Sequence, residues 1–330
     1  SFHPPLTMLE IVEAALFTTV QDAGRRGWQA FGIPVSGPMD AFALRAANLL
    51  VDNPPAAAAL EVGITSAEFH CHADSLVAVC GAGFRLLVDN RSLPLWMSVY
   101  VRAGSFLRIE KAGDGNWAVL AVHGGIQTQP VLGSRATTLR ATLGTEPARS
   151  LAPGNLLAIG PSRAFLPGLA ARKLSQPPVY KPNPTIRFLP GPQRDWFTPE
   201  ALKTFSASVY SLSPTSDRTG YRLSGPALTR ARSGEMVSEG MARGCIQVPA
   251  DGQPIIMQAD CPTMGGYPKI ASVISADQPL LAQTPFANGQ IRFIETDIET
   301  AQSSYRQIIR EMDNQIRQAS DGDDYLWAGF

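Results

Sequence analysis

The sequence is short of several features that define common classes of protein. Only 17% of its 330 residues are charged, its 28 basic and 28 acidic residues cancel, and no basic run stands out. Nucleic acid is therefore not an expected partner. No apolar run approaches the ~18 residues of a membrane-spanning helix, so we expect no membrane association. The four cysteines include no CxxC pair, and we expect them to be reduced and mostly buried.

Standard catalytic and cofactor motifs are also missing. The sequence contains no GxxxxGK[ST] phosphate loop, no GxSxG elbow, no HExxH pair and no GxGxxG that opens a helix. His70 and His72 flank Cys71 at strand spacing and share a face, but no third ligand is evident, so we predict no metal site. Residues 1–7 show no signal-peptide pattern, which together with reduced thiols predicts a cytoplasmic location.

Glycine and proline are abundant, with 29 and 27 residues, and short apolar runs lie between them. Ten of these runs read as strands: SLVAVCG, FRLLVDN, SFLRIE, WAVLAVHGG, NLLAIG, TIRFLP, CIQVP, PIIMQAD, KIASVIS and QIRFIE. Many short strands at close spacing favour barrels or sandwiches over alternating βαβ units. The sequence therefore predicts a mostly β chain with a few helices.

Three segments have helical signatures. The first is 37–52, where Pro38 suits the first helical position and Asp40 the first turn. The second begins at Thr198, a natural cap that is followed by proline. The third begins at Thr296 with a capping box and runs to about residue 318.

A proline-rich stretch divides the chain into two halves. Six prolines fall between positions 161 and 184, with no strand-like run among them. The chain length suits about two domains of ordinary size. We predict an N-terminal domain over 1–165, a linker over 166–184 and a C-terminal domain with a final helix over 185–330.

A long irregular segment over 18–40 is the first candidate for function. It contains Gln21, Asp22, Arg25 and Ser36 and leads into a helix start, which attracts anions. The alternative is that Asp22 and Arg25 pair with each other and only hold the loop.

Two further glycine-punctuated segments contain arginines. In 123–137, Arg135 can bind a carboxylate or phosphate through its planar fork. In 213–223, Asp217, Arg218 and Tyr221 surround a turn. An internally paired turn is the alternative there.

The last two segments are 238–254 and 259–275. Gln247 alternates with apolar neighbours along a strand, so it faces away from them. The second segment contains Asp260 and then the run TMGGYPK, in which Gly265 and Gly266 permit close backbone approach beside Tyr267 and Lys269.

These segments resemble one protein family. The stretches TTVQDAGRRGW, GIPVSGPMDAFALRAANLLVDNPPAAAALEV, GGIQTQPVLGSRAT, LPGPQRDWF, SDRTGYRL, IQVPADGQPIIMQAD and TMGGYPKIASVI are similar to the KipA family. That family includes the PxpC component of 5-oxoprolinase and the carboxyltransferase domain, subdomains A and B, of urea carboxylase, and is also labelled allophanate hydrolase subunit 2. The resemblance extends in order over nearly the whole chain.

The resemblance implies a fold, partners and an activity. It implies two cyclophilin-like β-barrel domains and two partner proteins, one KipI-like (PxpB) and one of the LamB/YcsF type (PxpA). Together, such proteins open 5-oxoproline to glutamate with ATP and Mg, so the chain is expected to be an ATP-dependent lactam hydrolase subunit that is active with its partners. One alternative is a biotin-dependent carboxyltransferase subunit that acts on urea or a similar amide. A second alternative is a KipA-like regulator that antagonises a KipI-like kinase inhibitor.

The resemblance also implies roles for the candidate residues. The expected catalytic residues are Asp22, Arg25, Asp217, Arg218 and Lys269. The expected substrate-binding residues are Gln21, Ser36, Arg135, Tyr221, Gln247, Asp260, Gly265, Gly266 and Tyr267, and Glu239 is a further carboxylate. The chain departs from the family pattern at His123, where relatives commonly have alanine, and in IQTQP, where they commonly read IDVPP.

Overall fold

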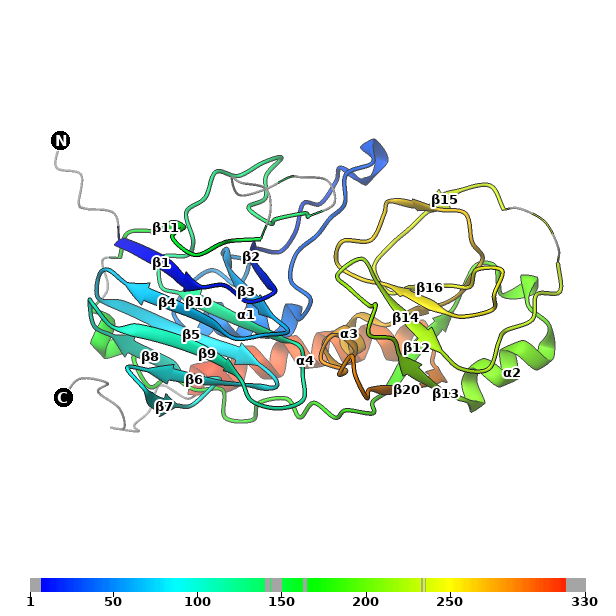
Figure 1. Cartoon of the computed structure of the whole chain (residues 1–330). Coiled ribbons are helices and arrows are strands. Elements are labelled where there is room, and N and C mark those ends of the chain that lie inside the picture. Colours follow the sequence, from blue (N-terminus) through cyan, green and yellow to red (C-terminus); the bar gives the residue numbers. More distant parts are fainter. Residues whose placement is uncertain are drawn as a thin grey trace. The chain divides into compact units, whose positions relative to one another are not determined.

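The computed structural model describes residues 7–139, 143, 150–162, 165–232, 234 and 236–318. These residues form two compact units. The first takes in the described parts of Ser1–Arg25, Asp40–Pro178 and Arg310–Phe330, and the second comprises 26–39 and 179–309. Strands dominate both units, which confirms the mostly β prediction, and each of the ten predicted runs contains a strand (Figure 1).

The first unit is built from two antiparallel sheets. The six-stranded sheet has the order β11 (Leu156–Ile159), β1 (Thr7–Glu13), β4 (Ala67–Cys71), β9 (Phe106–Lys111), β6 (Phe84–Val88) and β7 (Arg91–Leu93). The five-stranded sheet has the order β2 (Phe17–Gln21), β3 (Ala59–Gly63), β10 (Trp117–Val122), β5 (Ser75–Gly81) and β8 (Ser98–Val101). Side chains from both sheets, such as Phe69 and Leu120, form one buried core.

Helix α1 (Ala41–Leu50) packs against β5 and β10. Every residue of these two strands is buried, because one face meets the shared core and α1 lies against the sheet. This double burial explains why SLVAVCG and WAVLAV are continuously apolar rather than alternating.

The second unit is a closed barrel. Its strand order is β12 (Thr185–Pro190), β19 (Lys269–Val273), β16 (Cys245–Gln247), β17 (Ile255–Met257), β14 (Gly220–Ser224), β13 (Val209–Leu212) and β20 (Gln290–Glu295). β12 and β20 pair in parallel and close the ring, and the other neighbours are antiparallel. A short ribbon, β15 (Glu239–Gly240) with β18 (Met264–Gly265), accompanies the barrel.

An aromatic cluster fills one part of the barrel core. Helix α2 (Pro199–Ala207) packs on β20, and its Phe205 stacks on Phe293 with ring centroids 4.5 Å apart. Phe188 and Tyr210 complete the cluster, and all four rings are buried. Such rings contribute strongly to core energetics because each buries a large apolar area.

Two of the three predicted helix starts differ from the structure. Asp40 is the N-cap of α1 and accepts a hydrogen bond from the Ala43 amide, so the helix begins after Pro38 and not at it. Thr198 caps α2 as predicted. In α4 (Ile298–Gln318), Asp297 rather than Thr296 accepts the amide of Thr300. Aspartate and threonine both favour the N-cap position, and in α4 the aspartate occupies it.

Shorter helical elements were not foreseen. They are α3 (Gln278–Ala282) and the 3₁₀ turns η1 (Gln29–Phe31), η2 (Leu166–Leu169), η3 (Arg194–Trp196) and η4 (Ser275–Asp277). Too few residues are present in each for a helical period to emerge from the sequence.

The chain passes from the first unit to the second at Pro178–Val179, within the proline-rich stretch. Residues 171–174 of that stretch belong to the first unit. The Ala171 amide donates to the Ser98 carbonyl at 2.8 Å, and the Ser98 amide donates to the Arg172 carbonyl at 2.8 Å. Two segments, 26–39 and 310–318, join the unit that their sequence position does not predict. Backbone hydrogen bonding and packing therefore decide to which unit these segments belong, and the amino-acid composition does not.

Among the described residues, no helix is long and apolar enough to cross a membrane. The four cysteines are free, and Cys71, Cys80 and Cys261 are buried, which confirms the expectation of reduced and mostly buried thiols. Burial raises the pKa of Cys71 to about 12 and that of Cys261 to about 11, so both thiols are protonated at neutral pH.

Truncation of one ring of the aromatic cluster tests this description of the barrel core. We expect Phe293→Ala to destabilise the second unit by about 3–5 kcal/mol, because a buried ring is lost and a cavity is left. Ile294→Ala is the matched control on the same strand, since Ile294 is 53% exposed. Denaturant unfolding measures both, and equal midpoints for the two variants would contradict the prediction.

Candidate functional site

A buried ion pair joins two strand ends of the barrel. Arg218 precedes β14 and Asp260 follows β17, and these antiparallel neighbours pair Gly220 with Met257. Arg218 Nε donates to Asp260 Oδ2 at 3.0 Å, and Nη2 donates to Oδ1 at 3.2 Å. Both side chains are 2% exposed. A two-pronged contact of this kind is the strongest form of arginine–carboxylate pair.

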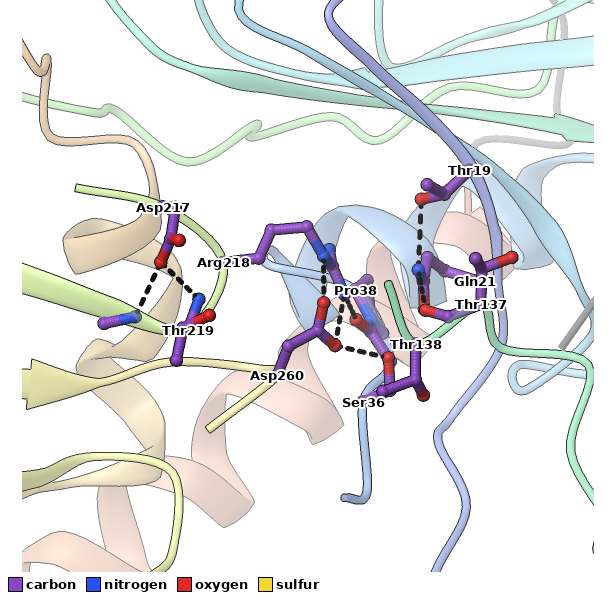
Figure 2. A network of polar contacts seen from close by, with 12 residues as sticks. Thr19, Gln21, Ser36, Pro38, Thr137, Thr138, Asp217, Arg218, Thr219 and Asp260 are labelled. Atoms are coloured by element: carbon purple, nitrogen blue, oxygen red, sulfur yellow. Dashed lines mark hydrogen bonds and ion pairs between the residues drawn. The ribbon is translucent and has the colours of Figure 1, made fainter. Parts of the chain in front are cut away.

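The same pair holds the segment 26–39 in the second unit (Figure 2). Ser36 Oγ donates to Asp260 Oδ1 at 2.6 Å, and Arg218 Nη2 donates to the Gly37 carbonyl at 2.7 Å. Ser36 has a φ of 59°, a backbone conformation that costs energy for a residue other than glycine. The contacts to the ion pair offset that cost, so Arg218, Asp260 and Ser36 position this loop.

Asp217 has a local role beside the pair. Its Oδ1 accepts the amides of Thr219 at 2.8 Å and Gly220 at 3.1 Å, as Figure 2 shows. This is the arrangement with which aspartate closes a tight turn. Tyr221 is fully buried, and its hydroxyl donates to the Ala282 carbonyl at 3.0 Å. The structure therefore places both residues in the framework of the barrel.

A second group of polar residues surrounds Lys269 at the start of β19. Its side chain is 7% exposed, and Nζ donates to Glu239 Oε2 at 2.9 Å and to the Gly240 carbonyl at 3.1 Å. Glu239, on the β15–β18 ribbon, is 46% exposed and also accepts Gln193 Nε2 at 2.8 Å. A buried cation thus lies beside a carboxylate that solvent reaches. We call Lys269, Glu239, Gln193 and Gln247 the lysine cluster.

The hydrogen bond from Lys269, followed by that from Gln193, lowers the pKa of Glu239 below its ordinary value. The carboxylate is therefore ionised at neutral pH. Because the folded-state pKa is lowered, the interaction stabilises the fold above the ordinary pKa and is lost as the pH falls through the folded-state pKa.

Gln193 is held against Lys269 by a close backbone approach. The Lys269 amide donates to Gln193 Oε1 at 3.1 Å, and the Gln193 amide donates to the Lys269 carbonyl. The turn that delivers Gln193 contains Gly191, where a Cβ would lie 2.1 Å from the Lys269 carbonyl oxygen. Only glycine fits there, which explains the glycine of the GPQ sequence in this turn.

Gln247 supplies an unused acceptor to the lysine cluster. It pairs with Lys269 across β16 and β19 and is 9% exposed. Its Oε1 is buried and has no hydrogen-bond partner among the described residues. A Cβ at Gly265 would lie 3.2 Å from this oxygen and 2.6 Å from Met241 Cε. A buried acceptor without a donor is costly, and it indicates a place where a ligand or water donates.

Gln258 is a related feature that the sequence did not signal. It is fully buried between β17 and Asp260, and neither polar atom of its side chain has a partner among the described residues. Gln193 was missed as well, although it lies in the LPGPQRDWF stretch. A Cβ at Gly266 would lie 3.5 Å from the Met236 carbonyl oxygen and from Ser238 Oγ, and Tyr267 is 46% exposed.

The candidates in the first unit form a separate framework. Arg25 is fully buried and donates to the carbonyls of Val131, Ser134 and Ala136 and to Thr138 Oγ1. Asp22 accepts Ser134 Oγ and the Arg135 amide, both at 2.6 Å. Asp22 and Arg25 thus hold the loop 131–138, each through its own contacts.

The remaining candidates of this unit are also engaged. Gln21 Nε2 donates to Thr19 Oγ1 and the Thr137 carbonyl, as Figure 2 shows, while its buried Oε1 has no partner among the described residues. Arg135 donates to the Thr128 carbonyl and Gln127 Oε1. His123 Nδ1 lies 2.7 Å from the Val51 carbonyl oxygen.

Comparison with known proteins places this geometry in a family. The model of the carboxyltransferase domain, subdomains A and B, matches residues 31–295. The chain belongs to this family. It is 38% identical to the C subunit of 5-oxoprolinase from Escherichia coli, over 89% of this chain and 93% of that protein.

Solved structures are similar as well. The structure of TTHA0988 matches with a TM-score of 0.80 and 32% identity, over 88% of this chain. Kluyveromyces lactis urea amidolyase matches with a TM-score of 0.87 and 27% identity, over 96% of this chain. The chain spans 56% of the TTHA0988 chain and 20% of the urea amidolyase chain.

The buried pair can be tested by removing one charge. We expect Asp260→Asn to destabilise the second unit by about 3–5 kcal/mol, because it leaves the Arg218 guanidinium buried without a counter-charge. Glu295→Gln breaks the exposed pair with Arg194 and is expected to cost about 1 kcal/mol or less. Chemical denaturation of both variants provides the comparison, and similar losses would refute the positioning role.

The ionisation of Glu239 gives a second test. Carboxyl NMR titration is expected to place its pKa below 4.5 in the wild-type chain and higher in Lys269→Met, because the donor that favours the ionised form is gone. Glu110, whose pKa is lowered by Arg85 in the first unit, is the internal control and stays unchanged. An unaltered Glu239 titration in the variant would contradict the Lys269 contact.

Proposed function

We propose that this chain is the C component of a 5-oxoprolinase, a complex that opens 5-oxo-L-proline to L-glutamate at the expense of ATP. The similarity to the E. coli protein supports this, because it extends over 93% of that protein as well as 89% of this chain. The observation that carries the proposal within the structure is the unused acceptor of Gln247 beside Lys269 and Glu239.

The lysine cluster suits the chemistry of a lactam. Ring opening adds water to the carbonyl carbon, breaks the carbon–nitrogen bond and transfers a proton to the departing nitrogen. An amide presents one N–H donor and one carbonyl oxygen, so it needs an acceptor for the first and a positive group for charge on the second. Gln247 Oε1 offers the acceptor.

Lys269 and Glu239 supply the remaining requirements. An ammonium has three donors, and Lys269 uses two of them on described residues, Glu239 and Gly240. The third can reach a ligand oxygen on which negative charge develops. The ionised and half-exposed Glu239 can accept a hydrogen bond from the attacking water and so orient it, while the proton goes to the departing nitrogen. In this proposal Gln193 is a positioning residue, since it holds both partners of the pair.

The described residues do not by themselves fit a nucleotide. Of the predicted cations, Arg25 and Arg135 are engaged with backbone carbonyls and Arg218 with Asp260. Among the described residues Lys269 keeps one donor to spare, which the lactam oxygen would use. The sequence also lacks a phosphate loop. We therefore propose that ATP and Mg bind mainly to the two partner proteins, the KipI-like PxpB and the LamB/YcsF-type PxpA. The cytoplasmic location remains a prediction that the free cysteines support.

A carboxyltransferase that acts on urea is the second candidate. The fold similarity to K. lactis urea amidolyase, over 96% of this chain, favours it. Urea is also a small amide with N–H donors, so the lysine cluster suits it too. Biotin would be the carboxyl carrier only in this alternative.

The chain purified together with its partner proteins distinguishes the candidates. We expect 5-oxoproline to stimulate ADP release and glutamate formation, and avidin to leave both unaffected. Turnover of urea and bicarbonate that avidin abolishes would replace this proposal with the carboxyltransferase. Tight binding to the KipI-like partner without turnover of either substrate would favour the regulatory alternative.

Variants of the lysine cluster locate the activity. We expect Glu239→Gln and Lys269→Met to lower kcat by about 10²–10³-fold, the usual loss when a preorganised polar group at the reacting centre is removed. Glu295→Gln, in an exposed pair elsewhere on the barrel, leaves kcat unchanged. Circular dichroism and complex formation verify folding of each variant. Wild-type kcat in both cluster variants would move the active site elsewhere.

A further inference from the structure

Two histidines and a glutamate meet on the outer face of the six-stranded sheet of the first unit. Strands β1 and β4 are antiparallel neighbours (Figure 1). Their register pairs Glu10 with His70. Leu9 and Cys71, adjacent to them in sequence, are buried in the core. Because side chains alternate along a strand, Glu10, His70 and His72 share the opposite face. We call these three residues the histidine triad.

The triad converges on a single oxygen atom. His72 Nε2 lies 2.8 Å from Glu10 Oε2, and His70 Nδ1 lies 3.6 Å from the same atom. The three ligand atoms all lie within 4.8 Å of one another. Bond lengths of about 2.0–2.1 Å in a tetrahedral zinc site place ligand atoms about 3.3 Å apart, so these separations bracket what Zn²⁺ requires.

The rings are already oriented by their neighbours. The His70 ring stacks on Phe106 with centroids 4.7 Å apart and planes 18° apart. His72 meets the edge of the His70 ring at 4.5 Å. Preorganised rings reduce the cost of binding a cation.

The surrounding charge also favours a cation. Glu13 and Glu68, on the same two strands, share the single guanidinium of Arg108. Together with Glu10 they provide three negative charges against one positive charge, which leaves two negative charges. A surface ion pair requires only one partner for the carboxylate, and it contributes little to stability. An ion pair alone therefore does not account for the second imidazole at the same carboxylate oxygen.

We propose that Glu10, His70 and His72 bind one divalent transition-metal ion, with Zn²⁺ the best match. Two imidazoles and one carboxylate are a ligand set that zinc accepts, and three protein ligands leave a fourth position for water. The bound ion would join β1 to β4 directly. This site lies within the first unit and is independent of the lysine cluster and of the proposed lactam chemistry.

Metal titration of the full chain tests the proposal. After treatment with a chelator and its removal, isothermal titration with ZnCl₂ is expected to show one ion per chain. Loss of one of three ligands is expected to weaken binding by at least about 10-fold in His70→Ala, His72→Ala and Glu10→Gln. Glu68→Gln is the matched control, since Glu68 lies on β4 two residues from His70 and pairs with Arg108. It removes a nearby charge but no ligand, so its affinity is expected to fall by less than that of any triad variant.

A second measurement separates binding from folding. Zn²⁺ is expected to raise the melting temperature of the wild-type chain and of Glu68→Gln, since a ligand of the folded state stabilises it. The three triad variants are expected to melt normally without metal and to show no such rise. Absence of saturable binding to the wild-type chain would overturn the proposal. So would wild-type affinity in His70→Ala and His72→Ala, because the ion would then bind elsewhere.

Discussion

The buried pair of Arg218 and Asp260 is the interaction on which the segment 26–39 of the second unit depends. Two charges withdrawn from water are stable only if they satisfy each other and their remaining hydrogen-bonding capacity. Here the carboxylate also accepts a hydrogen bond from the Ser36 hydroxyl, and the guanidinium also donates to the Gly37 carbonyl. These two hydrogen bonds hold the segment 26–39. A strained backbone at Ser36 is a consequence of that requirement.

The charged candidate residues fall into two groups. Arg218, Arg25 and Asp22 are hydrogen-bonded to other groups of their own chain. Lys269 and Glu239 differ, because the carboxylate is half exposed and the neighbouring Gln247 has an acceptor to spare. The proposed function therefore rests on the lysine cluster.

Strands and helix caps were predictable from the sequence where a single local rule determines them. TIRFLP and QIRFIE were recognisable as strands because side-chain alternation and flanking glycine or proline are local properties. The capping residue of α2 was predictable for the same reason, since Thr198 precedes a proline. The cap of α4 was misplaced by one residue, because Thr296 and Asp297 both satisfy the rule and only geometry selects between them.

The sequence by itself determined the mostly β character, the free cysteines, the family resemblance and the residues from which a site could be drawn. Only the tertiary structure decided which of those residues meet. Gln193, Glu239 and Lys269 are far apart in the chain and are brought together by strand pairing and by the turn at Gly191. Glu10 joins His70 and His72 through the register of β1 on β4. Contacts between distant segments depend on that register, and no local pattern encodes it. A slip of one residue would turn every side chain of the strand to the opposite face of the sheet.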